Sequence, residues 1–152
     1  MKRIRRLSRC ALFIGIGFLL GLIAIEAADN LNLQAKLIWG TNDGKPNDPN
    51  LSEVEPGTAE KLRGVFKWKY YFEVSRTNFT VNAGAMTLLK MSRKCDVKVR
   101  NLGKSKVAVE LYGEGKLLVQ KRQPIKPGEL LVLAGDDKND TAWFVILTLQ
   151  ER

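Results

Sequence analysis

The chain has 152 residues, with 25 lysines and arginines against 16 acidic residues, and it contains no histidine. The missing histidine excludes the usual general base, the Ser–His and Cys–His nucleophile pairs and the commonest ligand of zinc and copper. No Gly-x-Ser-x-Gly, Ser-x-x-Lys or phosphate-loop motif occurs either. We therefore expect a protein that is not an enzyme and that carries no cofactor.

The first 28 residues have the pattern of an export signal. A basic cluster runs into the apolar stretch Cys10–Ile25, which is followed by Glu26, Ala27 and Ala28. This order predicts a signal peptide over residues 1–27. The apolar stretch is shorter than the roughly 20 residues that span a bilayer comfortably, and an uncleaved membrane anchor is the alternative. Either way, residues 28–152 would be exported to the periplasm or the cell surface, and only an uncleaved N-terminal segment would contact the membrane.

Residues 28–152 keep 20 basic and 15 acidic residues, a net charge of +5. This modest charge and the exported location argue against a nucleic-acid partner. Cys95 is the one cysteine left, so no intrachain disulfide can form. It alternates with charged residues in phase with Val97 and Val99, which predicts a small buried hydrophobe.

The first half of this single predicted domain holds one strand, one loop and one helix. Leu31–Leu37 alternates apolar and polar residues and predicts a strand that ends near Trp39. A flexible loop is expected at about 40–57, where Asn, Asp, Gly and Pro concentrate. Thr58 is then expected to cap a short helix over Ala59–Arg63.

From Phe66 onward the pattern repeats every two residues. Leu130–Ala134 and Trp143–Leu149 are the most apolar runs, and we expect them to be central strands. The other expected strands are Tyr70–Arg76, Phe79–Val81, Met86–Met91, Val97–Val99, Val107–Leu111 and Leu117–Arg122. Eight or nine short strands and one short helix predict an all-β protein, either an antiparallel β-sandwich or a barrel-like closure of one.

This arrangement resembles a small uncharacterised all-β domain of exported bacterial envelope proteins, over about Ala59 to Leu149. The residues that carry the resemblance are mostly hydrophobic and turn positions: Leu62, Phe66, Tyr70 or Tyr71, Gly84, the Val97–Val99 and Val107–Leu111 pair, Pro127-Gly128, Gly135 and Trp143–Ile146. The resemblance implies a fold and an envelope setting, and it implies no catalytic residue.

One stretch could serve recognition, because cations and aromatic rings interleave over Arg63–Phe72. The candidate interaction patch consists of Arg63, Lys67, Trp68, Lys69 and Tyr71. The alternation also has a purely structural interpretation, which we favour. In that case Phe66, Trp68, Tyr70 and Phe72 would face the core, and Lys67, Lys69, Tyr71 and Glu73 would face water.

Two loops contain oxygen ligands that suit calcium in principle. One holds Asn42, Asp43, Asn47 and Asp48, and the other holds Asp136, Asp137, Asn139 and Asp140. Turns select the same residue types for backbone reasons, and neither loop has an EF-hand spacing, so we predict no metal site.

The leading hypothesis is a non-enzymatic exported β-domain that acts through contacts with an unknown protein partner in the bacterial envelope, as an accessory to secretion or surface assembly. The alternative is a binder of anionic glycans or lipid head groups through Arg63–Phe72.

Overall fold

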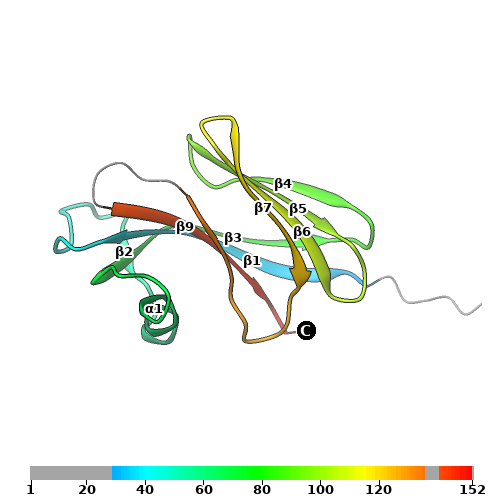
Figure 1. Cartoon of the computed structure of the whole chain (residues 1–152), viewed down its shortest axis with the longest axis horizontal. Coiled ribbons are helices and arrows are strands. Elements are labelled where there is room, and N and C mark those ends of the chain that lie inside the picture. The colour runs from blue at the N-terminus through cyan, green and yellow to red at the C-terminus, as the bar shows by residue number, and fades with distance from the viewer. Residues whose placement is uncertain (1–28, 136–140, 152) are drawn as a thin grey trace, which may run out of the picture.

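The computed structural model describes residues 29–135 and 141–151, and in this part the chain forms two antiparallel sheets and one helix (Figure 1). The five-stranded sheet has the order β2 (Ser52–Glu53), β3 (Tyr70–Val81), β1 (Leu31–Thr41), β9 (Thr141–Leu149), β8 (Leu131–Ala134). The four-stranded sheet has the order β4 (Met86–Lys90), β5 (Cys95–Asn101), β6 (Lys106–Gly113), β7 (Lys116–Pro124). Both sheets have free edges, so the expected sandwich is confirmed and the barrel-like closure is not formed.

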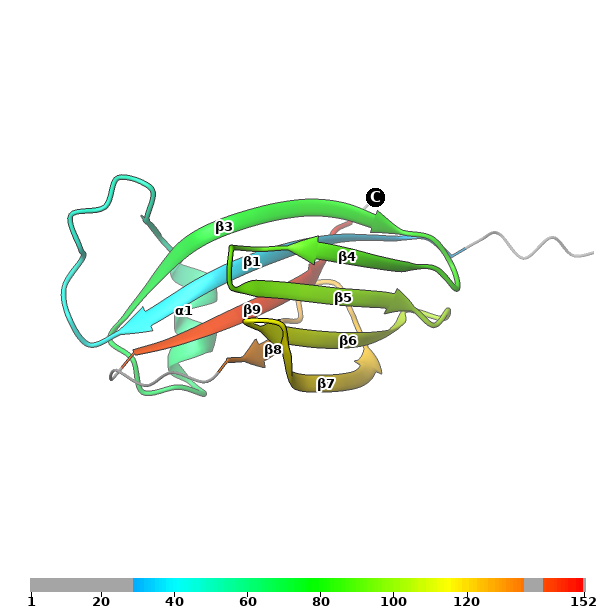
Figure 2. The same ribbon diagram turned by 90° about the horizontal axis from the view of Figure 1, so that it is seen from above.

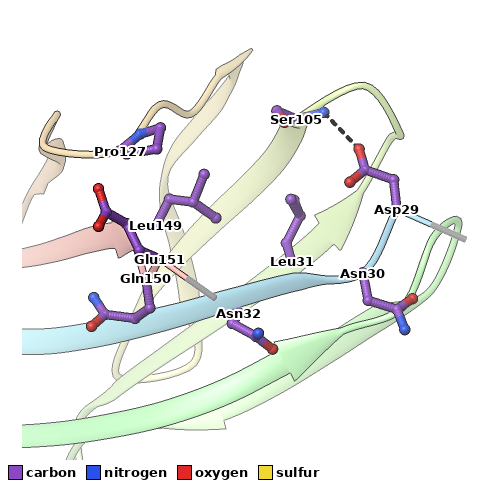
Figure 3. A pocket seen from close by; sticks show the side chains of 9 residues that line it. All are labelled: Asp29, Asn30, Leu31, Asn32, Ser105, Pro127, Leu149, Gln150 and Glu151. Atoms are coloured by element: carbon purple, nitrogen blue, oxygen red, sulfur yellow. Dashed lines mark hydrogen bonds between the residues drawn. The ribbon is translucent and has the colours of Figure 1, made fainter.

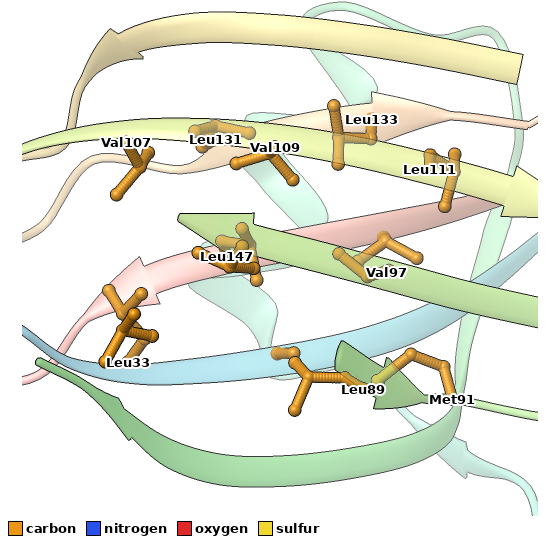
Figure 4. Packing of buried hydrophobic residues seen from close by; sticks show 14 of the residues in the cluster. Leu33, Leu89, Met91, Val97, Val107, Val109, Leu111, Leu131, Leu133 and Leu147 are labelled. Carbon is orange, nitrogen blue, oxygen red and sulfur yellow. The ribbon is translucent and has the colours of Figure 1, made fainter. Parts of the chain in front are cut away.

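The main core lies between the two sheets (Figure 4). Alternate residues of β1, from Leu31 to Leu37, face the alternate valines of β5 and β6. Cys95 belongs to this cluster and is 3% exposed, and burial raises the pKa of its thiol to about 12. Cys95 is therefore the buried hydrophobe that the sequence predicts.

A second core covers the opposite face of the five-stranded sheet. Here α1 (Pro56–Arg63) packs Leu62 among Ile38 of β1 and Phe144 of β9. The strands β1, β3 and β9 extend beyond the four-stranded sheet toward α1 (Figure 2). The five-stranded sheet is thus the middle layer, with the second sheet on one face and the helix on the other.

Several element boundaries differ from the expectation. β1 continues to Thr41, β2 lies within the predicted loop at about 40–57 and α1 begins at its end, so the longest irregular part is 42–51. The helix begins at Pro56, not at a Thr58 cap, because Pro56 occupies the first helical position, which needs no N–H donor. Its N-cap, Glu55, directs its side chain to β1 and β3.

β3 is one strand of 12 residues, where the sequence predicts two. Leu37 pairs with Ser75 and Ile38 pairs with Glu73, so Val74 is an extra residue that forms a β-bulge. The bulge breaks the two-residue period without ending the strand.

β8 is an edge strand, which corrects the expectation that it is central. Its apolar run has another cause, since both of its faces are covered. Leu131 and Leu133 face the four-stranded sheet, while Val132 packs in the cluster around α1.

Candidate functional site

The structure does not bring the predicted interaction patch together on one exposed surface. Arg63, Lys67 and Lys69 are exposed, and Trp68 is partly buried. Tyr71 is only 3% exposed; its hydroxyl donates to the Phe66 carbonyl at 3.5 Å, and burial raises its pKa. A ligand on the surface cannot reach Tyr71, so the patch as predicted is wrong at this residue.

The favoured structural interpretation is confirmed for Lys67, Lys69 and Phe72 and is wrong for the two tyrosines between Lys69 and Phe72. Tyr70 is 43% exposed although it was expected in the core, and Tyr71 is buried although it was expected in water. Residues 66–69 lie outside any strand, so the period of two does not extend across them. Tyr71 pairs with Gly40 and faces α1, while Phe72 pairs with Trp39 on the other face, and both faces are covered here.

Trp68 has a structural position above Gly40. A Cβ added at Gly40 would lie 2.8 Å from Cδ1 of Trp68 and 3.0 Å from Cε2 of Phe144. Glycine therefore lets the indole approach the backbone of β1 closely. Next to it, the Lys69 backbone N–H donates to the Asn42 side-chain oxygen at 3.2 Å. These contacts fix the segment between α1 and β3, and they use the aromatic ring for packing.

The expected absence of metal stays a prediction for the loop at Asp136, Asp137, Asn139 and Asp140, which lies outside the described residues. In the other loop, Asp48 accepts from the backbone and side chain of Asn50, as in an Asx turn. Among the described residues, no group of three or more histidine, cysteine or acidic side chains could hold a metal ion.

Four charges form a closed network on the face that carries α1. Lys36 Nζ lies 2.8 Å from Glu55 Oε2, and Arg76 bridges Glu55 at 2.8 Å and Glu73 at 2.7 Å. The hydrogen bond from Lys36 lowers the pKa of Glu55 to about 2, and the hydrogen bond to Glu73 raises the pKa of Arg76. The Glu55 carboxylate is thus held ionised by its two cations, and Glu73 is paired with Arg76, which suits a structural clamp.

Two shallow depressions stand out on the described part of the chain. One, of about 370 Å³, lies between the start of β1, the end of β9 and the β5–β6 turn (Figure 3). Its Asp29 carboxylate accepts the backbone N–H of Ser105 at 3.1 Å. The other, of about 380 Å³, is mostly apolar and lies between the end of α1 and Leu130 and Val132. Neither brings together a nucleophile and a base.

Within the described part of the chain, the four-stranded sheet and its turns concentrate the positive charge. Residues 86–124 contain ten lysines and arginines and three acidic residues, a net charge of +7. The rest of the described chain has eight basic and nine acidic residues, a net charge of −1. Only Lys94 and Lys98 of these ten form ion pairs within the described residues, with Glu114 and Glu110. The positive charge of this sheet is therefore largely uncompensated.

Strand register places five of the ten cations and two of the three carboxylates on the outer face of the sheet, a net charge of +3. Leu89, Val97, Leu111 and Val119 form one row across the four strands and point into the core, so the neighbouring rows point outward. Each outward row has one residue from each of β4, β5, β6 and β7, in that order. The rows are Met86, Arg100, Ala108, Arg122; then Leu88, Lys98, Glu110, Gln120; then Lys90, Asp96, Tyr112, Leu117; and the pair Lys106 and Pro124 of β6 and β7 lies at the end of the sheet. We call this surface the basic face.

Tyr112 is the aromatic centre of the basic face. Lys98 Nζ lies 4.6 Å from the centroid of its ring and donates to its hydroxyl oxygen at 3.1 Å. The Tyr112 hydroxyl donates in turn to Glu110 at 2.6 Å. Contact with Tyr112 raises the pKa of Lys98. The centre of the face is thus an ordered array, with unpaired cations around it.

Aliphatic side chains at one margin complete the basic face. Met86 is 52% exposed and Leu88 is 60% exposed, both on the edge strand β4. Arg100 Nη2 extends over β4 to within 3.9 Å of Met86 Sδ. Apolar contacts and a cationic head group therefore lie together at this edge.

Comparison of the chain with protein-family models, with curated proteins and with solved structures found no match in any of the three. Within residues 29–135 and 141–151, no helix has the length and apolar character that crossing a bilayer requires. The basic face was not predicted from the sequence. Its signal was present in the count of charges between residues 86 and 124, but the pairing of the strands was needed to show which five of the ten cations share the outer face.

Proposed function

We propose that this protein is a non-enzymatic binding protein of the bacterial envelope, which acts through contacts with a protein partner, and that the basic face is the surface it uses. The observation that carries this proposal is the net charge of +7 on residues 86–124, against −1 on the rest of the described chain. A surface with one sign of charge favours a partner of the opposite sign and accelerates its approach.

The chemistry of the side chains supports a binding role. The sequence has no histidine, and Glu55 and Glu73 are engaged by Lys36 and Arg76. The envelope setting rests on the export pattern of the first 28 residues, which lie outside the described part of the chain.

A protein partner is favoured over a lipid or glycan surface because the basic face mixes its cations with the exposed side chains of Met86 and Leu88 and the partly buried ring of Tyr112. Protein interfaces commonly combine apolar and aromatic contacts at the centre with arginine and a polar rim. The partner is accordingly expected to present carboxylates around an apolar contact.

Charge reversal on two separate surfaces tests the proposal. In the variant Arg100→Glu, Lys106→Glu, Arg122→Glu, three exposed cations of the basic face become anions. The control Arg63→Glu, Lys67→Glu, Lys69→Glu makes the same change of charge beside α1. Each tagged protein is produced in the envelope, cross-linked and purified, and its cross-linked partners are compared by mass spectrometry.

We expect the first variant to lose the partners of the unmodified protein and the control to keep them. If instead the control lost the partners and the first variant kept them, the binding site would be the Arg63–Phe72 stretch. Equal capture by all three proteins would reject a role for charge in partner binding.

A further inference from the structure

The outer edge of β4 has backbone groups without a strand partner. Met91 and Cys95 are hydrogen-bonded across the turn, since the Met91 N–H donates to the Cys95 carbonyl at 2.9 Å. In an antiparallel pair, hydrogen-bonded residues alternate with residues whose N–H and C=O point the other way. The register extends this alternation from Met91 back along β4. The backbone groups that point away from β5 are therefore those of Met86, Leu88 and Lys90. Within the described chain, β5 is the one strand that pairs with β4.

Of the other free edges, those of β7 and β8 carry features that discourage pairing. β7 has Lys121, Arg122 and Pro124 and a bulge next to Tyr112. The Lys121 ammonium group donates to the Val132 carbonyl of β8 at 2.8 Å. This hydrogen bond uses a carbonyl that an additional strand beside β8 would need. Charged side chains, proline and bulges are the usual protections of edge strands. β4, with the sequence Met-Thr-Leu-Leu-Lys, has one charge and neither proline nor bulge.

We propose that β4 receives an extended acidic segment of the partner as an additional strand of the four-stranded sheet. This inference rests on the proposed function and names the kind of partner. Added strands gain affinity from the main-chain ladder and specificity from alternate side chains. The residues of the segment opposite Met86, Leu88 and Lys90 would lie on the basic face with them.

The neighbouring side chains define the pattern of the segment. Arg100 places its guanidinium group beside Met86, so a carboxylate fits at the first position. Leu88 is apolar and 60% exposed, so an apolar side chain fits at the second. Lys90 forms no ion pair in the described structure, so a carboxylate fits at the third. The expected segment thus reads acidic, any, apolar, any, acidic.

A second copy of this chain is disfavoured as the occupant. Pairing β4 with its counterpart would place two sheets with a net charge of +7 side by side, which is repulsive. β4 itself contains no acidic residue that could meet Lys90 or Arg100 of the other copy.

A synthetic peptide tests the inference directly. The probe is the fluorescein-labelled peptide Ser-Asp-Thr-Val-Thr-Asp-Ser, and its binding to the full chain in detergent is measured by anisotropy. One control peptide has lysine in place of both aspartates. The other has proline in place of valine, which keeps the charge and removes the N–H that would bond to the Leu88 carbonyl.

We expect the probe to bind, and both control peptides to bind at least about ten-fold more weakly. In the protein, Leu88→Pro should weaken binding of the probe at least about ten-fold, and Leu88→Ala, which keeps the N–H, should change it less than Leu88→Pro. The amide protons of Met86, Leu88 and Lys90 in the unmodified protein should exchange more slowly when the probe is bound. This last measurement holds even if Leu88→Pro fails to fold.

Equal binding of the valine and proline peptides would overturn strand addition, and so would unchanged exchange of the three amides. Phosphatidylglycerol vesicles form a separate arm of the experiment. If the protein bound the vesicles and did not bind the peptide, the ligand of this edge would be a membrane surface and not a protein segment. If Leu88→Pro keeps the cross-linked partners that the basic-face variant loses, the proposed function stands and strand addition is rejected.

Discussion

At the residue scale, Glu55 couples the helix to the sheet through its charge. Its carboxylate lies 2.8 Å from both Lys36 Nζ and Arg76 Nη2, and Lys36 is only 7% exposed. Without Glu55 the buried ammonium group would keep only Glu73, at 3.9 Å, which is costly because a buried charge needs a close partner. The network therefore holds the first turn of α1 against β1 and β3.

The lowered pKa of Glu55 makes part of the stability depend on pH. In the folded protein it titrates near 2, against an ordinary value of 4.5. Between these values the unfolded chain binds a proton that the folded protein does not, so stability falls as the pH falls. Above 4.5 the contribution of Glu55 is fully present.

We expect Glu55→Gln to lower the free energy of unfolding by about 1 kcal/mol at about pH 7, a modest value because the Glu55 side chain is half exposed and solvent screens its charge. At about pH 2 this difference should largely vanish, because the unmodified residue is then becoming protonated in the fold as well. Urea unfolding followed by tryptophan fluorescence measures both values. Glu53→Gln is the control, and an equal effect of Glu55→Gln at both pH values would contradict the linkage.

The side-chain environment of single residues was the part least accessible to sequence reasoning. Tyr70 and Tyr71 are adjacent and chemically identical, yet one is exposed and the other buried. Their orientation follows from pairing with Thr41 and Gly40 of a strand some 30 positions earlier in the chain. No local period contains that information.

At the scale of elements, the bulge in β3 accommodates one extra residue, and the pairs on either side of it remain in register with β1. Glu73 and Ser75 already pair with consecutive residues of β1, Ile38 and Leu37, and they lie on opposite faces. Val74, which is 40% exposed, is therefore the residue that a regular ladder would omit.

We expect deletion of Val74 to leave the fold intact and to change the free energy of unfolding by less than about 1 kcal/mol, because no buried group is lost. Deletion of Thr77 should lower the free energy of unfolding by about 3 kcal/mol or more. To restore the pairing with β1, the strand would have to shift by one residue, which would turn the Arg76 side chain away from its carboxylates and toward the core. Thermal and urea unfolding compare the two deletions. Similar destabilisation by both would show that the bulge itself is required.

The elements that were predicted correctly are those whose two faces differ. β1 and the β5–β6 hairpin have one face toward the main core and one toward polar surroundings, so their alternation is regular over Leu31–Leu37 and Val97–Leu111. β8 was misplaced because α1 covers its outer face, and an apolar run on both faces does not distinguish a central strand from a covered edge strand. β2 has two residues and no pattern to detect.

At the scale of the whole molecule, the separation of charge opposes folding at low ionic strength. Eight basic residues of the four-stranded sheet form no ion pair in the described structure, and they repel one another in the fold more than in the expanded chain. Salt screens this repulsion over about 10 Å at 0.1 M.

We expect the free energy of unfolding to rise by about 1 kcal/mol between about 0.02 M and about 0.5 M sodium chloride, as screening relieves the repulsion. The variant Arg100→Glu, Lys106→Glu, Arg122→Glu should respond less, because its sheet has lost most of its net charge. Urea unfolding across the salt series checks this. A salt response of the same size in both proteins would point to general ion effects instead.

The unequal charge of the two sheets also gives the molecule a permanent electric dipole moment. In the field of a negatively charged surface such a dipole experiences a torque, which turns the four-stranded sheet toward that surface before any contact is made. The molecule would therefore meet an acidic partner already oriented with β4 and the basic face in front, and fewer encounters would be lost to rotational search.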